Sequence, residues 1–130
     1  SISDVINVHR SFDPEVIEGG HSPGQLRFYS HMSPTGVKYS EPDDIPKHVN
    51  FWLNNEWSTP WDAHCAYELI HPFCDGNGRS GRILLAKHLD FDLAKVNSLI
   101  GDDYIDNIVY FHDNNDFTNM IRNKRLSEYL

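Results

Sequence analysis

The sequence predicts a mainly α-helical single domain with one β-hairpin and an anion-binding loop between two central helices. Three observations lead to this prediction. Apolar residues recur at helical spacing through most of the chain, residues 25–40 alternate around a turn, and residues 71–82 form a glycine-rich loop between two helical runs. With 130 residues the chain can bury one core but not two, so we expect a single domain over residues 1–130.

Composition and charge indicate which kinds of binding partner and which cellular location to expect for this protein. The chain has 11 lysines and arginines against 19 aspartates and glutamates, a net charge of −8, which argues against nucleic acid or an anionic membrane as a partner. Cys65 and Cys74 are the two cysteines, and we expect reduced thiols. Without a signal peptide or a run of about 18 apolar residues, we expect no membrane span and a cytoplasmic location, with secretion as an effector by a non-Sec route left open.

The first expected element is a brief helix near the N-terminus. Three apolar residues share helical spacing there: Ile2, Val5 and Ile6. His9 and Arg10 follow, and we expect both at the surface. Pro14 and the glycine pair at residues 19–20 then break the helix.

A β-hairpin is the next expected element. Residues 25–30 alternate in polarity, residues 33–36 read Ser-Pro-Thr-Gly as a turn, and residues 37–40 resume an extended composition. A lone two-stranded hairpin is marginally stable in water. Its use would be as an edge that a segment of a target protein joins by strand addition, and a plain connector is the alternative.

Two helices are expected before the glycine-rich loop. The first spans residues 43–56, with this apolar stripe: Ile45, Val49, Trp52, Leu53 and Trp57. The second begins at the Thr-Pro-Trp-Asp sequence of residues 59–62, with Thr59 as N-cap, and leads to His71. Its core-facing stripe is Trp61, Cys65 and Leu69. His64 lies seven residues before His71 on nearly the same side, and a structural role is favoured over a supporting role in the site.

Residues 71–82 read His-Pro-Phe-Cys-Asp-Gly-Asn-Gly-Arg-Ser-Gly-Arg. Pro72 cannot continue a helix, and helical composition resumes at Arg79, so the layout is helix, tight loop, helix. Gly76 and Gly78 permit positive φ or close backbone approach. The loop can therefore turn its N–H groups toward the free amides at the start of the next helix, which is an anion site.

The charged side chains of this loop indicate a phosphate ligand. Arg79 and Arg82 are three apart on one helix face, where their positive charges oppose the helix dipole by roughly 0.3–1 kcal/mol each until an anion binds. Two guanidiniums imply more than one phosphate group. Asp75 is a hard oxygen ligand suited to Mg²⁺, and His71 can act as a neutral base at physiological pH.

Each of these features has a structural alternative. A glycine turn, a histidine at a helix end and two arginines on one face are each more often a plain turn, a cap and a solvated surface. Their coincidence within twelve residues favours magnesium-assisted phosphoryl or nucleotidyl transfer. The competing class is a binding module that holds a nucleotide without chemistry.

The remaining elements follow the loop. Residues 83–86 are apolar on nearly every side, which predicts a central helix surrounded by others. Further helices are expected over residues 93–100 and 104–112. A last helix is expected to carry these apolar residues: Phe117, Met120, Ile121 and Leu126.

The loop resembles the signature of the Fic (filamentation induced by cAMP) domain family, H-x-F-x-D/E-G-N-G-R-x-x-R, and fills every specified position. Residues 23–27, Pro-Gly-Gln-Leu-Arg, resemble the Gly-x-x-Arg segment that opens the family's docking flap. Tyr104 and the region of residues 116–117 stand where family members have their closing helices. The resemblance covers a core of about residues 20–122.

The resemblance implies transfer of AMP from Mg-ATP to a Ser, Thr or Tyr hydroxyl of a target protein. His71 would be the general base and Asp75 the Mg²⁺ ligand, while Phe73 would anchor the loop. The phosphate-binding residues implied are Gly76, Asn77, Gly78, Arg79 and Arg82. The docking flap implied, where a target would add a strand, contains Leu26, Arg27, Phe28, Val37 and Tyr39.

Some family members move UMP, phosphocholine or phosphate instead, and these groups stay open as alternatives. The sequence also departs from autoinhibited members, whose inhibitory helix reads Ser/Thr-x-x-x-Glu-Gly/Asn. Residues 14–19 lack the hydroxyl, and Ser127 with Glu128 does not fit. We therefore expect restraint by a separate, antitoxin-like protein, or a fragment of a longer chain, or an unrestrained domain.

Overall fold

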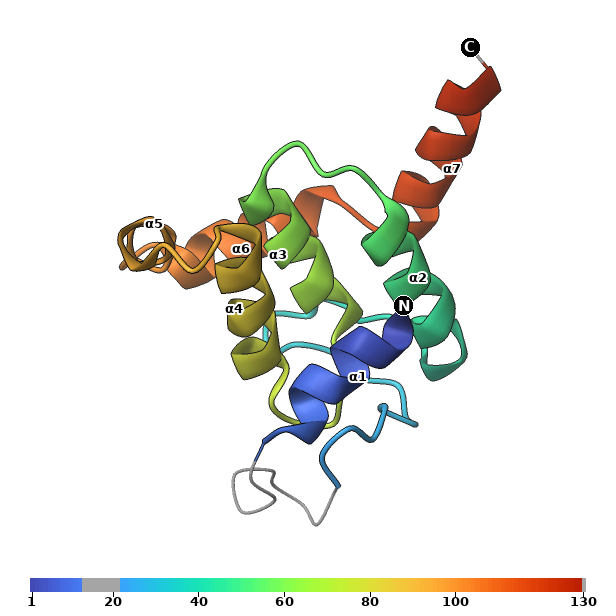
Figure 1. Ribbon diagram of the computed structural model, residues 1–130. Coiled ribbons are helices and arrows are strands. Elements are labelled where there is room, and N and C mark those ends of the chain that lie inside the picture. Colours follow the sequence, from blue (N-terminus) through green and yellow to red (C-terminus); the bar gives the residue numbers. More distant parts are fainter. Residues whose placement is uncertain (13–21, 130) are drawn as a thin grey trace.

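The computed structural model describes residues 1–12 and 22–129 and is mainly helical, as predicted (Figure 1). Its helices are α1 (Ile2–Arg10), α2 (Ile45–Asn54), α3 (Pro60–Ile70), α4 (Asn77–His88), α5 (Leu93–Leu99), α6 (Tyr104–Asn114) and α7 (Phe117–Tyr129), with a 3₁₀ turn η3 (Pro42–Asp44). The break expected at Pro14 and residues 19–20 lies outside the described residues. In the part of the chain that is described, no helix has the length and apolar character needed to cross a bilayer.

Helix α3 is the centre of the fold. It packs against α4, α2 and α6, and these residues are buried: Ala63, His64, Cys65, Ala66, Tyr67, Leu69 and Ile70. The predicted start of α3 is confirmed, since the Thr59 hydroxyl accepts a hydrogen bond from the Asp62 amide at 3.1 Å. The prediction that residues 83–86 are surrounded is wrong in part, because Ile83 on α4 is 41% exposed while Leu84 and Leu85 are buried.

Helix α2 is shorter than predicted. It ends at Asn54, and Asn55 is extended. Trp57 therefore does not continue the helical stripe, although its indole donates to the Trp52 carbonyl at 2.9 Å and its ring packs against the core.

Helix α1 contributes side chains to the hydrophobic core, so this core includes residues that precede residue 20. Val5 and His9 are each 1% exposed. The expectation that His9 is a surface group is wrong, because Val5 and His9 are four residues apart and share the buried face of α1. Arg10 is exposed, as expected.

The segment before α2 has the predicted turn but not the predicted strands. The Ser33 amide donates to the Val37 carbonyl at 2.8 Å, and the Gly36 amide to the Ser33 carbonyl at 3.0 Å. Among the described residues, pairing here consists of two isolated bridges, Leu26 with Phe73 and Met32 with Lys38. Leu26 therefore pairs with the glycine-rich loop, and pairing between the two arms of the segment is limited to the residues next to the turn.

Candidate functional site

The backbone of His71 turns sharply at the end of α3. Its φ of 52° and ψ of 60° are left-handed, a conformation that costs a residue with a Cβ roughly 1–2 kcal/mol. Pro72 follows and prevents the helix from continuing. A left-handed residue is common at a helix end, and at a non-glycine residue the strain makes His71 a candidate for a functional role.

The His71 imidazole is held between rings from the segment before α2. It stacks on Tyr39, with centroids 4.0 Å apart and planes 5° apart, and His31 lies 5.2 Å away. Burial lowers the pKa of His71 to about 3, and the neighbouring His31 and Arg27 act in the same direction. The ring is therefore neutral at physiological pH and can accept a proton.

Arg27 is buried, which corrects its expected place on an exposed docking edge. It is 2% exposed, and its guanidinium donates to four carbonyl oxygens: Ile70, His71, Tyr29 and Ser40. The last carbonyls of a helix lack partners within the helix, and a cation is favoured at that end. Arg27 therefore caps α3 and fixes the backbone that carries His71.

Phe73 and Asn77 close the loop. Phe73 is fully buried, as expected of an anchor. The Asn77 side chain accepts from the Phe73 amide and donates to the Phe73 carbonyl, both at 2.8 Å. Gly76, with φ of 80°, is the N-cap of α4, so this conformation requires glycine or strain. The side-chain amide of Asn77 thus shapes the loop. The donors that the loop can offer to an anion are its backbone N–H groups.

His9 of α1 holds the same loop from the other side. The Gly24 amide donates to His9 Nδ1 at 2.7 Å, which makes Nε2 the protonated nitrogen, and Nε2 lies 2.7 Å from the Asp75 carbonyl oxygen. The ring also stacks on Phe73 at 3.8 Å. Sequence reasoning missed this role, although the four-residue spacing from Val5 was a signal that could have found it.

The residues for which the sequence predicts a role in the reaction line one cavity of about 380 Å³. Its lining residues are His31, His71, Cys74, Asp75, Gly76, Asn77, Gly78, Arg79 and Arg82. A Cβ at Gly78 would lie 2.9 Å from Arg82 Nη1, so the glycine leaves room for the guanidinium over the loop. The structure therefore brings together the predicted base, the Asp75 carboxylate, the loop amides and both arginines. Leu26, Phe28 and Val37 lie outside this cavity.

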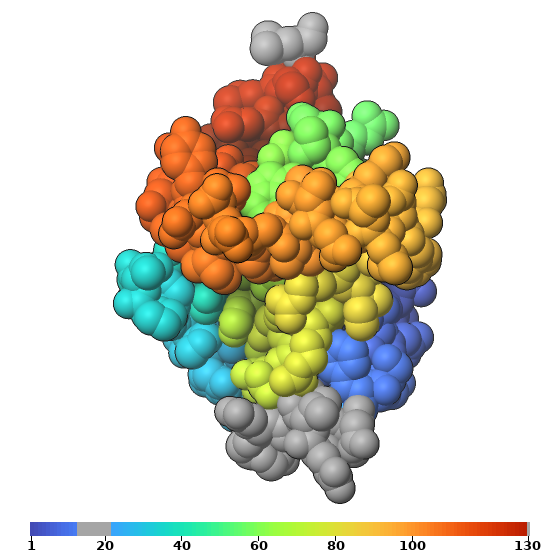
Figure 2. Space-filling view, turned by 90° about the vertical axis from the view of Figure 1, so that its left-hand side faces the viewer, coloured from blue at the N-terminus to red at the C-terminus, as the bar shows by residue number. Residues whose placement is uncertain are grey.

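A second cavity of about 430 Å³ adjoins the first, since His71, Gly78 and Arg82 line both. Its walls include Ile108 and Val109 of α6. In Figure 2, α6 (orange) crosses this face as a band above α4 (yellow), with the segment before α2 (cyan) at one side. The second cavity is mostly apolar and suits a flat ring system.

His64 ties three helices together. Its Nδ1 lies 3.1 Å from the Gly81 carbonyl oxygen, and its Nε2 lies 2.6 Å from the Tyr104 hydroxyl. Burial lowers the pKa of His64 to about 4, so the ring is neutral. This geometry agrees with the structural role that the sequence favoured.

Mg²⁺ fits this site only together with a phosphate ligand. In the described part of the chain, no three His, Cys, Asp or Glu side chains gather as a ready metal site. Asp75 is the one carboxylate that lines the cavity of the loop. Mg²⁺ characteristically binds through one or two carboxylates, with phosphates and water completing its shell.

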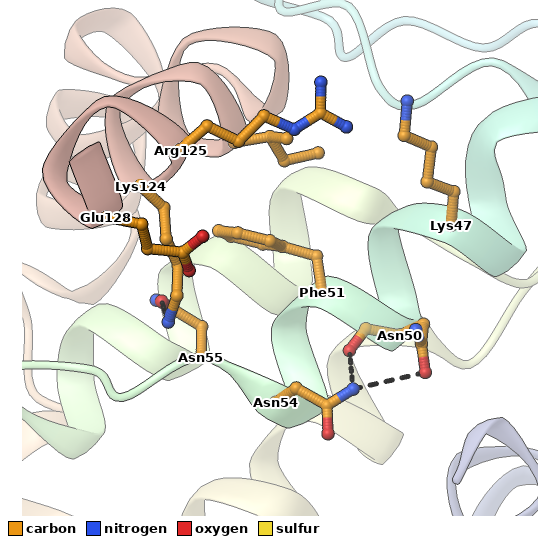
Figure 3. A pocket seen from close by; sticks show the side chains of 9 residues that line it. Lys47, Asn50, Phe51, Asn54, Asn55, Lys124, Arg125 and Glu128 are labelled. Atoms are coloured by element: carbon orange, nitrogen blue, oxygen red, sulfur yellow. Dashed lines mark hydrogen bonds between the residues drawn. The ribbon is translucent and has the colours of Figure 1, made fainter.

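Another hollow lies between α2 and α7, away from the loop (Figure 3). Lys47 and Phe51 of α2 face Lys124 and Arg125 of α7 across it. It contains none of the residues of the glycine-rich loop, so it is separate from the candidate site.

Comparisons with known proteins identify a family and several similar chains. The profile of the Fic/DOC family matches residues 1–89. The protein adenylyltransferase fic-1 of Caenorhabditis elegans is 31% identical over 94 residues, which cover 65% of this chain and 18% of the relative. The protein adenylyltransferase Fic of Drosophila persimilis is 33% identical over 99 residues, with the same two shares. A probable protein adenylyltransferase of Aquifex aeolicus is 39% identical over 66 residues, covering 43% of this chain and 21% of the relative.

The chain spans about a fifth of the length of the curated relatives that it matches. The profile match covers more than half of the chain and includes the whole glycine-rich loop. The chain therefore belongs to the Fic/DOC family.

Proposed function

We propose that this domain transfers AMP from Mg-ATP to a Ser, Thr or Tyr hydroxyl of a target protein. The observation that carries the proposal is the neutral His71 imidazole lining the same cavity as the loop amides, Arg79 and Arg82. A phosphate-binding site without chemistry has no need of a base there. The names of the three relatives point to the same reaction.

In the proposed reaction His71 accepts the proton of the target hydroxyl. The hydroxyl oxygen then forms a bond to the α-phosphorus, and the bond from that phosphorus to the bridging oxygen breaks, so that pyrophosphate leaves. Arg79 and Arg82 stabilise the charge on the outer phosphates, and the loop amides stabilise the charge on the transferred group. Mg²⁺, held by Asp75 and the phosphates, would supply further charge neutralisation.

We infer that the target docks on residues 28–39. Phe28 is 62% and Met32 55% exposed, so this segment presents two apolar side chains that a docked target could cover. Strand addition would bring a hydroxyl to His71, because Tyr39 of the same segment stacks on that ring. A separate inhibitory protein remains our proposal for restraint of the domain.

The test uses ATP labelled at either the α- or the γ-phosphate, incubated with the protein and a cell lysate. We expect label from the α-position on protein, and its loss in His71→Ala with ATP affinity retained. His88→Ala, a change of the same kind on the exposed end of α4, is the control. Label from the γ-position would indicate phosphate transfer, and ATP binding without any labelled protein would favour a binding module.

A further inference from the structure

The imidazole of His71 is not oriented by a hydrogen bond within the described part of the chain. The hydrogen bonds of this residue there involve its backbone: the carbonyl accepts from Arg27, and the amide donates to the Tyr67 carbonyl. The one buried side-chain nitrogen or oxygen left unpaired among the described residues belongs to Glu68, so the ring nitrogens of His71 are not sealed from the cavity that the ring lines. A general base is normally oriented by a third group. Here that group has to act in some way other than by a hydrogen bond.

Tyr39 is the group that contacts the face of the His71 ring. The two rings are parallel to within 5°, with centroids 4.0 Å apart. The plane of the other neighbouring ring, His31, is tilted by 35°. The torsion that turns an imidazole about its Cβ–Cγ bond has broad minima, so packing decides the direction of the ring. The stack on Tyr39 is the contact that limits this rotation, because turning the imidazole would drive its edge into the phenol ring.

Arg27 holds the backbones that carry both stacked rings. Its guanidinium donates to the His71 carbonyl at 2.9 Å and also to the carbonyl of Ser40, the residue after Tyr39. The Tyr39 amide donates in turn to the His31 carbonyl at 3.2 Å, across the turn of the segment. Tyr39 and His71 are therefore fixed relative to each other by the backbone as well as by the stack.

The position of Tyr39 leaves the reacting edge of the imidazole free. Stacking covers a face of the ring, whereas the two nitrogens lie on its edge. His71 lines the cavity of the glycine-rich loop, and Tyr39 does not. Tyr39 can therefore orient the ring without taking the space that the phosphates of ATP would occupy.

We propose that Tyr39 is a positioning residue that fixes the direction of the His71 ring for proton transfer. The inference rests on the proposed function and deepens it. Tyr39 lies in residues 28–39, the proposed docking segment, so the same stretch of backbone would align both the base and the hydroxyl of a docked target. Misplacement of a reacting group by about 1 Å can cost roughly a hundredfold in rate, so the direction of this ring matters to the reaction.

The experiment compares Tyr39→Leu, which removes the planar ring, with Tyr39→Phe, which keeps it. Initial rates of protein labelling by α-labelled ATP are measured over a series of lysate concentrations. We expect Tyr39→Leu to lower the maximal rate roughly tenfold or more without changing the lysate concentration that gives half of it, and Tyr39→Phe to stay within about twofold of the wild type. Tyr110→Leu makes the same change on α6, at a side chain that is 71% exposed, and is the control.

Two further measurements separate positioning from other roles. Calorimetry with inorganic tripolyphosphate should give the wild-type affinity in both Tyr39 variants, because Tyr39 does not line the cavity of the loop. NMR relaxation of the ¹³C-labelled imidazole of His71 reports the mobility of the ring and does not depend on the reaction. We expect a rigid ring in the wild type and in Tyr39→Phe, and a mobile ring in Tyr39→Leu.

An equally rigid ring in Tyr39→Leu, or a wild-type maximal rate in that variant, would overturn the proposal. A change confined to the half-saturating lysate concentration would make Tyr39 a docking contact and overturn it as well. Equal losses in Tyr39→Leu and Tyr39→Phe would assign the effect to the phenol hydroxyl, against the stack. If the unaltered domain labelled no protein, the proposed function would fail, while the ring mobility would still decide whether Tyr39 orients His71.

Discussion

At the scale of single residues, burial sets the protonation of His71 and of Glu68, and it moves their pKa values in opposite directions. It lowers the pKa of His71 and raises that of Glu68. Desolvation disfavours the charged form in each case, so both side chains favour neutrality. His71 is thereby kept deprotonated at physiological pH, and Glu68 keeps its proton up to about pH 8.

The first prediction concerns the pH dependence of transfer. The pKa of His71 is about 3, so the ring of the proposed base stays neutral at pH values well above 3. We expect kcat/KM to show no acid limb near 6.5, the ordinary value for histidine. Tyr39→Ala, which uncovers the ring, should raise this pKa and bring an acid limb to higher pH. A limb near pH 6.5 in the unaltered protein would contradict the prediction.

The second prediction concerns stability and Glu68. The unfolded chain releases this proton above about pH 4.5, whereas the folded protein holds it to about pH 8. The folded state thus binds more protons between these values, and Glu68 costs increasing stability as pH rises through that window. Glu68→Gln should be more stable than the wild type by roughly 1–3 kcal/mol at pH 8, with the difference shrinking toward pH 4.5. Urea unfolding at several pH values measures it, and a constant difference would count against it.

At the scale of elements, helix ends were predictable where the determinants are local. Thr59, Pro60 and Asp62 lie within four residues, and α3 begins where they indicate. The hairpin was not predictable in the same way, because residues 26–27 pair with the loop at Pro72 and Phe73 through contacts more than forty residues distant. Alternating polarity cannot reveal that Arg27 is needed at the open carbonyl end of α3.

The third prediction tests α1 as the support of the loop. His9→Ala removes two hydrogen bonds and the stack on Phe73, and should destabilise the fold by roughly 2–4 kcal/mol. Asn7→Ala, on the exposed face of α1, is the control. Burial lowers the pKa of His9, so its contribution is complete above pH 6.5 and is lost as pH falls below that value toward the folded-state pKa. Equal stability of the two variants in urea unfolding would remove His9 from this role.

The fourth prediction tests the close crossing of α3 and α4. A Cβ at Gly81 would overlap the Glu68 carboxylate and lie 3.1 Å from Tyr67 Cδ1, so Gly81→Ala should cost roughly 1–3 kcal/mol. Adding Glu68→Ala should recover part of that loss. Gly101→Ala would bring its Cβ no closer than 4.0 Å to the Ser98 carbonyl oxygen, an ordinary contact, and should be close to neutral. If the losses of stability in the double variant were strictly additive, the side chains at the two positions would not interact.

For the whole molecule, the candidate loop was predictable because its determinants lie within twelve consecutive residues. The groups that support it were not, since His9 and Arg27 reach it from distant parts of the chain. A sequence motif indicates which groups take part in the function, and only the tertiary structure shows which residues hold those groups in place. Lone residues without periodic neighbours, such as Arg27, leave little trace of burial in a sequence.

The last prediction concerns how much of the chain the site requires. Helix α7 projects from the other helices (Figure 1), and Phe117 in its first turn is its one buried residue among those described. That ring stacks on His48 at 4.8 Å, whereas Leu126 is 56% exposed.

Removing residues 123–130 should therefore cost less than about 1 kcal/mol, because it deletes mainly exposed side chains. Phe117→Ala should cost roughly 3–5 kcal/mol, because it opens a cavity in the core. Urea unfolding measures both changes, and Mg-ATP affinity should survive the truncation. A truncated protein that loses nucleotide affinity while remaining folded would show that the outer turns of α7 act on the site.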